Sequence, residues 1–509
     1  MTQYSINGTE YAPNSLNFQA ALEAAYKNRV RPLCLCADPP LPMYIAHLET
    51  GYVIKRMPDT GASHGPGCDS YEAPPGLSGR GEVDGQAIEQ TDEGSVNLKL
   101  AFSLRHNNPA EMENESTQKT TAKTAGTRLT LRGLLHYLWD ESRLSHWQPE
   151  MQGERSWFAV RTALVEAIES KETKSASLKD ILYIPEVYDR EKSTDIACRR
   201  IRALSPIMGP GKSGKKLMLV VGEMDRISPA TFGYALKLKH LPDFPLVMDA
   251  DLNKNFEKVF DVINTLWAYT PDSHLIVIAT FVIDDKGLPS VEEMCVMLTS
   301  PEWLPIDNQF EQLLVKTLVT QKRSFQKQLR YNLPPDKPIA TAVLTDCDNA
   351  PLAMYIDVDD LASRWASTVA INEVVKNNSI ETWMWTPKEG ILPDIPPKKG
   401  MGPKPLQQVD ETPTADEEQA ADEAPARGAE AISEQAAVDD AAQAEHDEMD
   451  TQTPPAVPLA FQARRTTNLT VMPDRPPVLA EVTPIRATSL DLIPWNEGYG
   501  PNGAGGPQE

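Results

Sequence analysis

The stretch RPLCLCADPPLPMYIAHLETGYVIKRMPDTGASHGPGCDSYE, residues 31–72, organises the N-terminal part of this chain. It contains three of the six cysteines, Cys34, Cys36 and Cys68, and His64 precedes the last of them by four residues. Thiolate and imidazole groups are the usual ligands of structural zinc. The alternative is that the cysteines pack as small apolar side chains and that His64 belongs to a glycine-rich loop.

A β-hairpin separates the two pairs of potential ligands. Residues 43–49 and 52–57 read as strands, and Thr50 and Gly51 supply the turn between them. Because a hairpin returns its two ends to one place, we expect the four side chains to meet as a closed tetrahedral zinc site.

The composition favours a cytoplasmic protein with several domains. The 509 residues carry a formal net charge of -23, and the 15 acidic and two basic residues between positions 401 and 450 supply -13 of it. The rest of the chain is only mildly acidic, which leaves room for a nucleic-acid partner. No apolar run is long enough to cross a membrane, and the N-terminus lacks a signal-peptide pattern. In a reducing compartment, cysteines are expected to bind metal or stay free.

Further motifs accompany the Cys/His segment along the chain. They are RPLCLC, KRMP-x-TG-x2-H-x3-C-x-SYE, LRGLLHYLWDES, LMLVVGEM, HLIVIATF and EWLPIDNQFEQ. Together these motifs resemble a bacterial family known as domain of unknown function 1173, over roughly residues 15–390. The resemblance implies a protein of plasmids or other mobile genetic elements and strengthens the zinc prediction. It implies no activity.

Composition and periodicity divide the chain into six segments and predict an α+β fold. We expect a Cys/His hairpin module, a polar linker, a helical unit, a strand-rich unit, a second mixed domain and an acidic tail, at residues 1–106, 107–128, 129–205, 206–307, 308–396 and 397–509. In the strand-rich unit, strands are expected at 217–227, 232–240, 245–249 and 274–283, with one covering helix at 252–268.

The helical unit resembles a winged helix. Two helices, at residues 130–141 and 156–169, precede a strand-like segment. In such a unit, Arg132, Arg155 and Arg161 would be available for phosphate contacts. Plain packing of a helix pair is the alternative.

The segment GPGKSGKK, residues 209–216, nearly matches a Walker A loop. That loop requires Ser or Thr after its lysine and then a helix, whereas Lys216 and a strand follow Lys215. We therefore expect a basic turn without nucleotide binding.

Residues 308–387 carry the order helix, three strands, helix and strand, which resembles the PD-(D/E)xK nuclease core. In that family, acids bind magnesium and a lysine stabilises developing charge. Glu311, Asp346 and Asp357 are the carboxylates that could fill the acidic roles.

The chain departs from the nuclease pattern at the positions that matter for catalysis. Ala340 and Thr341 stand where the second strand should open with Pro-Asp, and Asp359 stands where the lysine belongs. We therefore expect a copy of this fold that has lost catalysis, with a magnesium-dependent nuclease as the alternative.

A run of cations without any acid lies between residues 312 and 335. Its basic residues are Lys316, Lys322, Arg323, Lys327 and Arg330. With aromatic residues interleaved, these side chains could follow a phosphate backbone. An ordinary solvated helix face is the alternative.

The sequence thus predicts a zinc-stabilised, nucleic-acid-binding protein of a mobile element, without catalysis and without a membrane partner. A non-enzymatic scaffold for protein interactions is a further alternative. The tail from about residue 397 is poor in aromatic residues, so we expect disorder. Its end, SLDLIPWNEGYG, could dock a protein partner.

Overall fold

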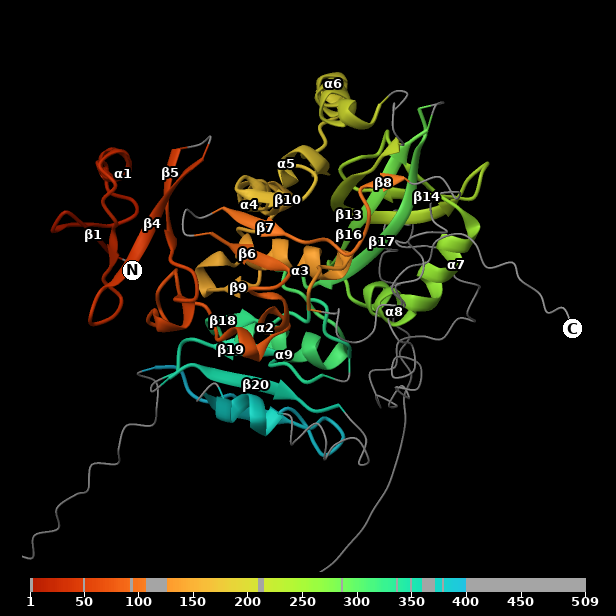
Figure 1. Ribbon diagram of the computed structural model, residues 1–509. Coiled ribbons are helices and arrows are strands. Elements are labelled where there is room, and N and C mark those ends of the chain that lie inside the picture. Colours follow the sequence, from red (N-terminus) through yellow and green to blue (C-terminus); the bar gives the residue numbers. More distant parts are fainter. Residues whose placement is uncertain are drawn as a thin grey trace, which may run out of the picture. The chain divides into compact units, whose positions relative to one another are not determined.

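Helices and strands both contribute to the fold, in agreement with the predicted α+β class (Figure 1). The computed structural model describes residues 3–48, 51–91, 95–106, 126–208, 215–284, 287–335, 337–347, 350–358, 371–377 and 380–399, which all belong to one compact unit. The hairpin turn at 49–50, most of the predicted linker, the Walker-like segment up to residue 214, Asp359 and the tail from residue 400 lie outside the described residues.

An antiparallel five-stranded sheet contains the predicted hairpin. Its strands, in spatial order, are β2 (Thr9–Tyr11), β1 (Tyr4–Ile6), β3 (Leu33–Cys34), β4 (Leu41–Leu48) and β5 (Gly51–Arg56). β5 pairs with β4 from Met43 opposite Arg56 to Leu48 opposite Gly51, which confirms the hairpin. Helix α1 (Phe18–Lys27) buries one apolar face in the same cluster of side chains as this sheet.

The predicted helix pair forms, but its first helix lies inside the protein. Thr130 caps α3 (Leu131–Glu141) by accepting a hydrogen bond from the backbone N–H of Gly133, and α3 contacts α4 (Trp157–Ile168). Nearly every residue of α3 is buried. A helix that is covered on all sides has no face to place in a DNA groove, so within a winged helix only the second helix, α4, could take that role.

The three arginines that were predicted to contact phosphate form hydrogen bonds within the protein. Arg132, Arg155 and Arg161 donate hydrogen bonds of 2.7, 2.9 and 3.2 Å to backbone carbonyl oxygens. Their guanidinium groups hold segments of this chain together, which explains arginines at these positions without a phosphate ligand.

Five strands between residues 218 and 299 close into a barrel. In order around the barrel they are β13 (Met218–Pro229), β14 (Tyr234–Leu238), β15 (Leu246–Met248), β17 (Pro289–Thr299) and β16 (His274–Ile283), and β16 pairs back with β13. Neighbouring strands are antiparallel, except for β15 and β17, which are parallel. The expected strands are confirmed, whereas their closure into a barrel was not predicted.

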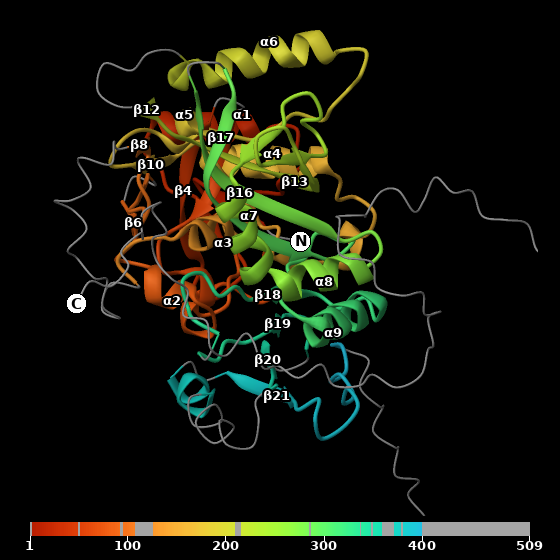
Figure 2. The same ribbon diagram turned by 90° about the vertical axis from the view of Figure 1, so that its right-hand side faces the viewer.

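Two helices, not one, connect β15 to β16. α7 (Ala250–Val259) begins at the cap Asp249, whose carboxylate accepts a 2.6 Å hydrogen bond from a backbone N–H of the first turn. The helix breaks at Phe260, where φ is -109°, and α8 (Asp261–Tyr269) follows. Figure 2 shows α8 next to α9 (Gln309–Thr320), and Gln312 donates a 3.0 Å hydrogen bond to the hydroxyl of Thr270.

A mixed sheet contains the C-terminal strands. Its order is β21 (Glu381–Trp385), β20 (Leu352–Ile356), β19 (Ala342–Leu344), β18 (Phe325–Lys327) and β9 (His146–Trp147). α9 precedes β18, and residues 371–377 are helical between β20 and β21. The order helix, three strands, helix and strand is therefore present, and β9 is an additional edge strand from far upstream.

Strand pairs also cross the predicted segment boundaries. β7 (Val96–Leu98) lies between β6 (Ile88–Gln90) and β10 (Lys171–Thr173), β8 (Arg105–His106) pairs with β12 (Lys215–Lys216), and β11 (Leu182–Tyr183) pairs with β13. The short helices are α2 (Arg80–Val83) and α5 (Leu178–Ile181), and α6 (Ser193–Leu204) is longer. Segments that look separate in the sequence therefore share sheets.

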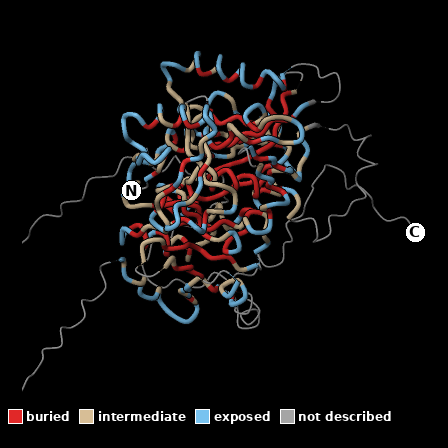
Figure 3. The backbone as a smooth tube through the Cα atoms, turned by 60° about the vertical axis from the view of Figure 1, so that its left-hand side comes forward, coloured by how far each residue is buried: buried red, intermediate tan, exposed pale blue. Residues whose placement is uncertain are grey.

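The buried residues run through the interior of the described part of the chain (Figure 3). The largest apolar cluster joins the barrel, α3, α4 and the C-terminal sheet, while α1 and the hairpin contribute to a smaller one. Among the described residues, no helix has the length and apolar character needed to cross a membrane.

Candidate metal centre and binding surfaces

The four predicted ligands of the Cys/His segment meet at one point. Cys34 ends β3 and Cys36 follows it, whereas His64 and Cys68 come after the hairpin and the short 3-10 helix Gly61–Ser63. The three sulfurs and one imidazole nitrogen all lie within 4.8 Å of one another, so the four residues could hold a metal ion.

Three of the six distances within this cluster are close to those of tetrahedral coordination. The Sγ atoms of Cys34 and Cys68 are 3.6 Å apart, and Nδ1 of His64 lies 3.2 Å from Cys36 Sγ and 3.8 Å from Cys68 Sγ. With metal–sulfur and metal–nitrogen bonds of about 2.3 and 2.0 Å, a tetrahedron has edges of about 3.5–3.8 Å. His64 thus presents Nδ1, and its Nε2 is buried without a hydrogen-bond partner among the described residues.

Backbone groups around the cluster support negative sulfur atoms. The N–H of Gly65 points at Cys36 Sγ at 3.4 Å, and the N–H of Ser70 points at Cys68 Sγ at 3.3 Å. A Cβ at Gly65 would lie 2.9 Å from the carbonyl oxygen of Cys36, so this close approach requires glycine. Such outer contacts orient the ligands of metal sites.

Burial and the contacts within the cluster shift the pKa values of the three thiol groups. The hydrogen bond from Cys34 lowers the pKa of Cys68 to about 4, and the same contact, together with burial, raises the pKa of Cys34. Burial also raises the pKa of Cys36. Because metal binding needs thiolates, a bound cation would displace protons from Cys34 and Cys36.

Several cations of the predicted surface at residues 312–335 are engaged in contacts within the protein and are not free to bind a ligand. Arg323, 3% exposed, forms hydrogen bonds of 2.7–3.1 Å with Asp346. Lys327, 2% exposed, lies 3.1 Å from Glu311. Their acidic partners lie just outside the acid-free stretch, so the count of charges along the sequence did not reveal the pairing.

The three remaining cations of this stretch differ in exposure. Arg330 is half-buried and donates a 2.7 Å hydrogen bond to the carbonyl oxygen of Lys337. Lys316 and Lys322 are exposed on α9 and at its end. Near them, Lys398 donates a 3.3 Å hydrogen bond to the carbonyl oxygen of Lys322. Only a small part of the predicted surface therefore faces solvent.

The predicted magnesium ligands are not brought together. Glu311 is buried beside Lys327 and also accepts a hydrogen bond of 3.0 Å from the backbone N–H of Asp307, while Asp346 binds Arg323. Asp357 is buried after β20. Among the described residues, the Cys/His cluster is the group of three or more ligating side chains that could hold a metal.

A different basic surface lies on the outside of the barrel. Arg226 on β13 is directly opposite Lys237 on β14, so the two side chains share one face. The residues that alternate with them on β14, Leu236 and Leu238, point into the barrel and are buried. Lys239 continues the row and binds Glu223. In the sequence, the alternation of apolar and basic residues along β14 could have indicated this surface.

The positive charges on this surface are only partly neutralised by neighbouring acids. Arg226 contacts its neighbour Asp225 at 2.8 Å, and both side chains are partly exposed. Lys237 has no ion-pair partner within the described part of the chain. At the end of the same face, the loop between β13 and β14 carries Phe232, which is 77% exposed.

Comparison with known proteins gives a family but no activity. A family model described as "Protein of unknown function (DUF1173)" matches residues 4–388. No curated protein and no solved structure matches the chain. The matched range contains the Cys/His cluster, the barrel and the C-terminal sheet.

Proposed function

The chain belongs to the DUF1173 family, and we propose that it binds nucleic acid through the outer face of its barrel and a structural zinc ion through Cys34, Cys36, His64 and Cys68. The observation that carries the nucleic-acid proposal is the row of cations Arg226, Lys237 and Lys239 on an open face of β13 and β14. Because family members are expected on plasmids and other mobile elements, DNA is the first nucleic acid to test.

The architecture of the barrel supports this proposal. A five-stranded Greek-key barrel with this strand order resembles the OB-fold, in which the face of the second and third strands binds oligonucleotides. The corresponding strands here are β14 and β15. Since a fold alone does not determine a function, the side chains on that face must carry the rest of the proposal.

The side chains of the barrel face suit a phosphate backbone. Exposed ion pairs such as that of Arg226 with Asp225 contribute little stability, so a phosphate can replace the carboxylate at small cost. Lys237 can bind a phosphate without first giving up a carboxylate partner. Phe232 adds an exposed ring at one end of the face, where a base can stack.

Zinc is the cation that fits the Cys/His cluster best. Three thiolates and one imidazole in tetrahedral spacing form a closed site with no position for a substrate. The ion would join the segment before the hairpin to the glycine-rich loop after it. Its proposed role is therefore to stabilise the N-terminal sheet.

The proposed function is not catalytic. The C-terminal unit has the element order of the PD-(D/E)xK core, but Glu311 and Asp346 are each bound to a cation of the same chain. Plasmid incubated with the full-length protein and magnesium is expected to stay intact. Cleavage that is lost in Asp357→Ala would support the nuclease alternative instead.

Binding of the full-length protein to 20-nucleotide single strands and duplexes, measured across a salt series, tests the nucleic-acid proposal. We expect affinity to fall with salt, because each phosphate contact releases counterions. Arg226→Glu/Lys237→Glu should weaken binding at least tenfold and reduce the slope of log K against log salt by about 1.5, since each contact contributes about 0.7–0.9.

A matched charge reversal controls for net charge. Lys316→Glu/Lys322→Glu changes the charge by the same amount on α9, and we expect it to alter affinity less than twofold. If this variant loses binding and the barrel variant keeps it, the interface lies at α9 as the sequence first indicated. Absence of binding at low salt would refute the nucleic-acid proposal.

A further inference from the structure

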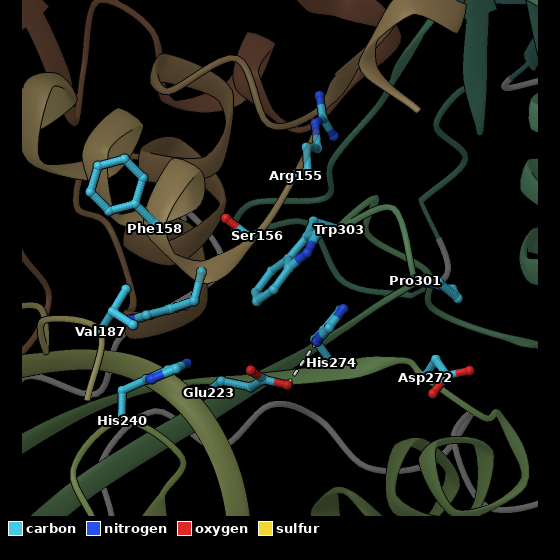
Figure 4. A pocket seen from close by; sticks show the side chains of 11 residues that line it. Arg155, Ser156, Phe158, Val187, Glu223, His240, Asp272, His274, Pro301 and Trp303 are labelled. Atoms are coloured by element: carbon cyan, nitrogen blue, oxygen red, sulfur yellow. Dashed lines mark hydrogen bonds and ion pairs between the residues drawn. The ribbon is translucent and has the colours of Figure 1, made fainter. Parts of the chain in front are cut away.

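An open cavity of about 500 Å³ lies where the row of cations on the barrel ends. Glu223 lines the cavity and binds Lys239. His240, which follows Lys239 in the chain, lines it as well. Figure 4 shows that further lining residues come from the start of α4, the start of β16 and the segment after β17. The cavity therefore adjoins the Lys239 end of the basic face.

Two pairs of stacked rings form walls of this cavity, and the two planes are nearly parallel within each pair. Trp157 stacks on His240 with 5.4 Å between ring centroids and 8° between planes. Trp303 stacks on His274 with 3.7 Å and 11°. Both indoles are buried, and the Nε1–H of Trp157 donates a 3.0 Å hydrogen bond to the carbonyl oxygen of Pro185. The orientation of the walls is thus fixed by the fold.

Apolar side chains at the mouth of the cavity are open to solvent. Phe158 is 68% exposed and Val187 is 40% exposed. In Figure 4, Val187 lies between Phe158 and His240. Exposed rings and aliphatic groups beside an open cavity are suited to the flat face of an aromatic ligand.

A buried carboxylate, that of Glu223, is one of the polar groups that line the cavity, together with Arg155, Ser156 and Asp272. Lys239 Nζ and His274 Nδ1, the latter at 2.7 Å, both contact Oε1 of Glu223. Among the described residues, no donor reaches Oε2. Burial alone would raise the pKa of Glu223, but His274 and Lys239 lower it, so the carboxylate stays ionised and accepts hydrogen bonds only.

We propose that this cavity receives one base of a single-stranded nucleic acid whose backbone lies along Arg226, Lys237 and Lys239. The base packs against Phe158 and Val187 at the mouth of the cavity, and its exocyclic amino group donates a hydrogen bond to Oε2 of Glu223. This inference rests on the proposed nucleic-acid function and adds the type of strand and the class of base.

The chemistry of the cavity selects the strand and the base. A base that is paired and stacked inside a duplex cannot enter the cavity, so a single strand is required. Cytosine, adenine and guanine carry an exocyclic amino group, which a carboxylate accepts well. The N–H of thymine is flanked by two carbonyl oxygens, which would face the carboxylate.

Binding of the full-length protein to 12-nucleotide strands of dC, dA or dT, and to a duplex of the same length, tests the inference. We expect dC and dA to bind roughly tenfold more tightly than dT, as expected for one favourable base contact. Phe158→Ala should weaken binding of dC and dA about 5- to 150-fold, which corresponds to the loss of one base stack. Glu223→Gln should remove the preference against dT.

Tyr269→Ala is the matched control, because Tyr269 is 78% exposed on α8 and does not line the cavity. It should leave all affinities unchanged. Equal affinity for dC and dT, or unchanged binding in Phe158→Ala, would overturn the base cavity. If in that case Arg226→Glu/Lys237→Glu still weakens binding, the proposed function stands without the cavity. Preference for the duplex would overturn the choice of a single strand.

Discussion

Glu311 and Lys327 form an ion pair inside the core, with 3.1 Å between the carboxylate Oε2 and Nζ. Both side chains are buried, and burial raises the pKa of Glu311 although Lys327 opposes this effect. The pair joins α9 to β18, two elements that the sequence assigned to a nuclease acid and to a nucleic-acid surface. In the structure, each satisfies the charge of the other.

Removing one partner of this pair should be costly. Lys327→Met leaves the Glu311 carboxylate buried without its cation, which should reduce the free energy of unfolding by about 3–5 kcal/mol. Glu311→Leu/Lys327→Met removes both charges and should recover much of this loss. Urea unfolding measures both effects. Lys316→Met, at an exposed position of α9, should stay within about 0.5 kcal/mol of the wild type; a similar small loss in Lys327→Met would contradict the burial of the pair.

Zinc should be lost when a ligand is replaced. We expect about one equivalent of zinc in the purified full-length protein, and much less in Cys36→Ser, because a closed site needs all four ligands. Metal analysis measures the content, and limited proteolysis should cut within residues 31–72 once the ion is gone. Cys198→Ser changes an exposed cysteine of α6 and should keep the metal. A wild-type protein without metal would favour simple packing of the cysteines.

Gly79 should not tolerate a side chain. A Cβ at this position would lie 1.8 Å from the carbonyl oxygen of Arg330, and the N–H of Gly79 donates a 2.8 Å hydrogen bond to Leu329. Gly79→Ala must separate these backbones and should cost about 1–3 kcal/mol or more. Gly67→Ala, with no atom within 4 Å of the added Cβ, is the control for thermal unfolding. Equal melting temperatures would argue against the close approach.

Acid should destabilise the protein through His136. Burial, and then the charge of Arg132, lower the pKa of His136 to about 3, whereas an unfolded histidine has a pKa of about 6.5. The unfolded state therefore binds more protons between these values. The contribution of His136 is complete above about pH 6.5 and is lost as the pH falls toward 3, by at most about 1.4 kcal/mol per pH unit.

His136→Asn tests this dependence, because the Asn oxygen can accept the 3.0 Å hydrogen bond that the Tyr331 backbone N–H donates to His136 Nδ1. Urea midpoints at pH 7.5, 6 and 5 should fall less steeply in the variant than in the wild type. His47→Asn, on the hairpin, should keep the steep dependence. Parallel curves for wild type and His136→Asn would assign the acid sensitivity to other groups.

The sequence predicted the cluster of Cys34, Cys36, His64 and Cys68 because its geometry is local. A single hairpin, whose strands alternate clearly, brings the two pairs together within 35 positions. The barrel was harder to predict from the sequence. Four of its strands were predicted, whereas β17 was not, and closure depends on β16 returning to β13 and on one pair between β15 and β17, Val247 opposite Ser290. No periodicity along the chain encodes such distant pairings.

Charge was the least reliable guide to the binding surface. The absence of acids between residues 312 and 335 suggested free cations, yet Asp346 and Glu311 lie outside this interval and bind Arg323 and Lys327. Linear composition does not report which side chains face each other across a sheet or from a helix to a strand. Conversely, Arg226 and Lys237 are 11 positions apart, and only their pairing on adjacent strands makes them neighbours.

The short pairing of β9 with β18 sets an order of events during synthesis. Residues 146–147 are made about 180 positions before residues 325–327, with which they share a sheet. A ribosome adds residues at roughly 5–20 per second, so β9 waits on the order of ten seconds or longer for its partner. During this interval His146 and Trp147, which are buried in the complete fold, lack the strand that pairs with them, and chains that terminate before residue 325 never supply it. Truncated products that end before residue 325 are therefore expected to be less soluble than the full-length chain.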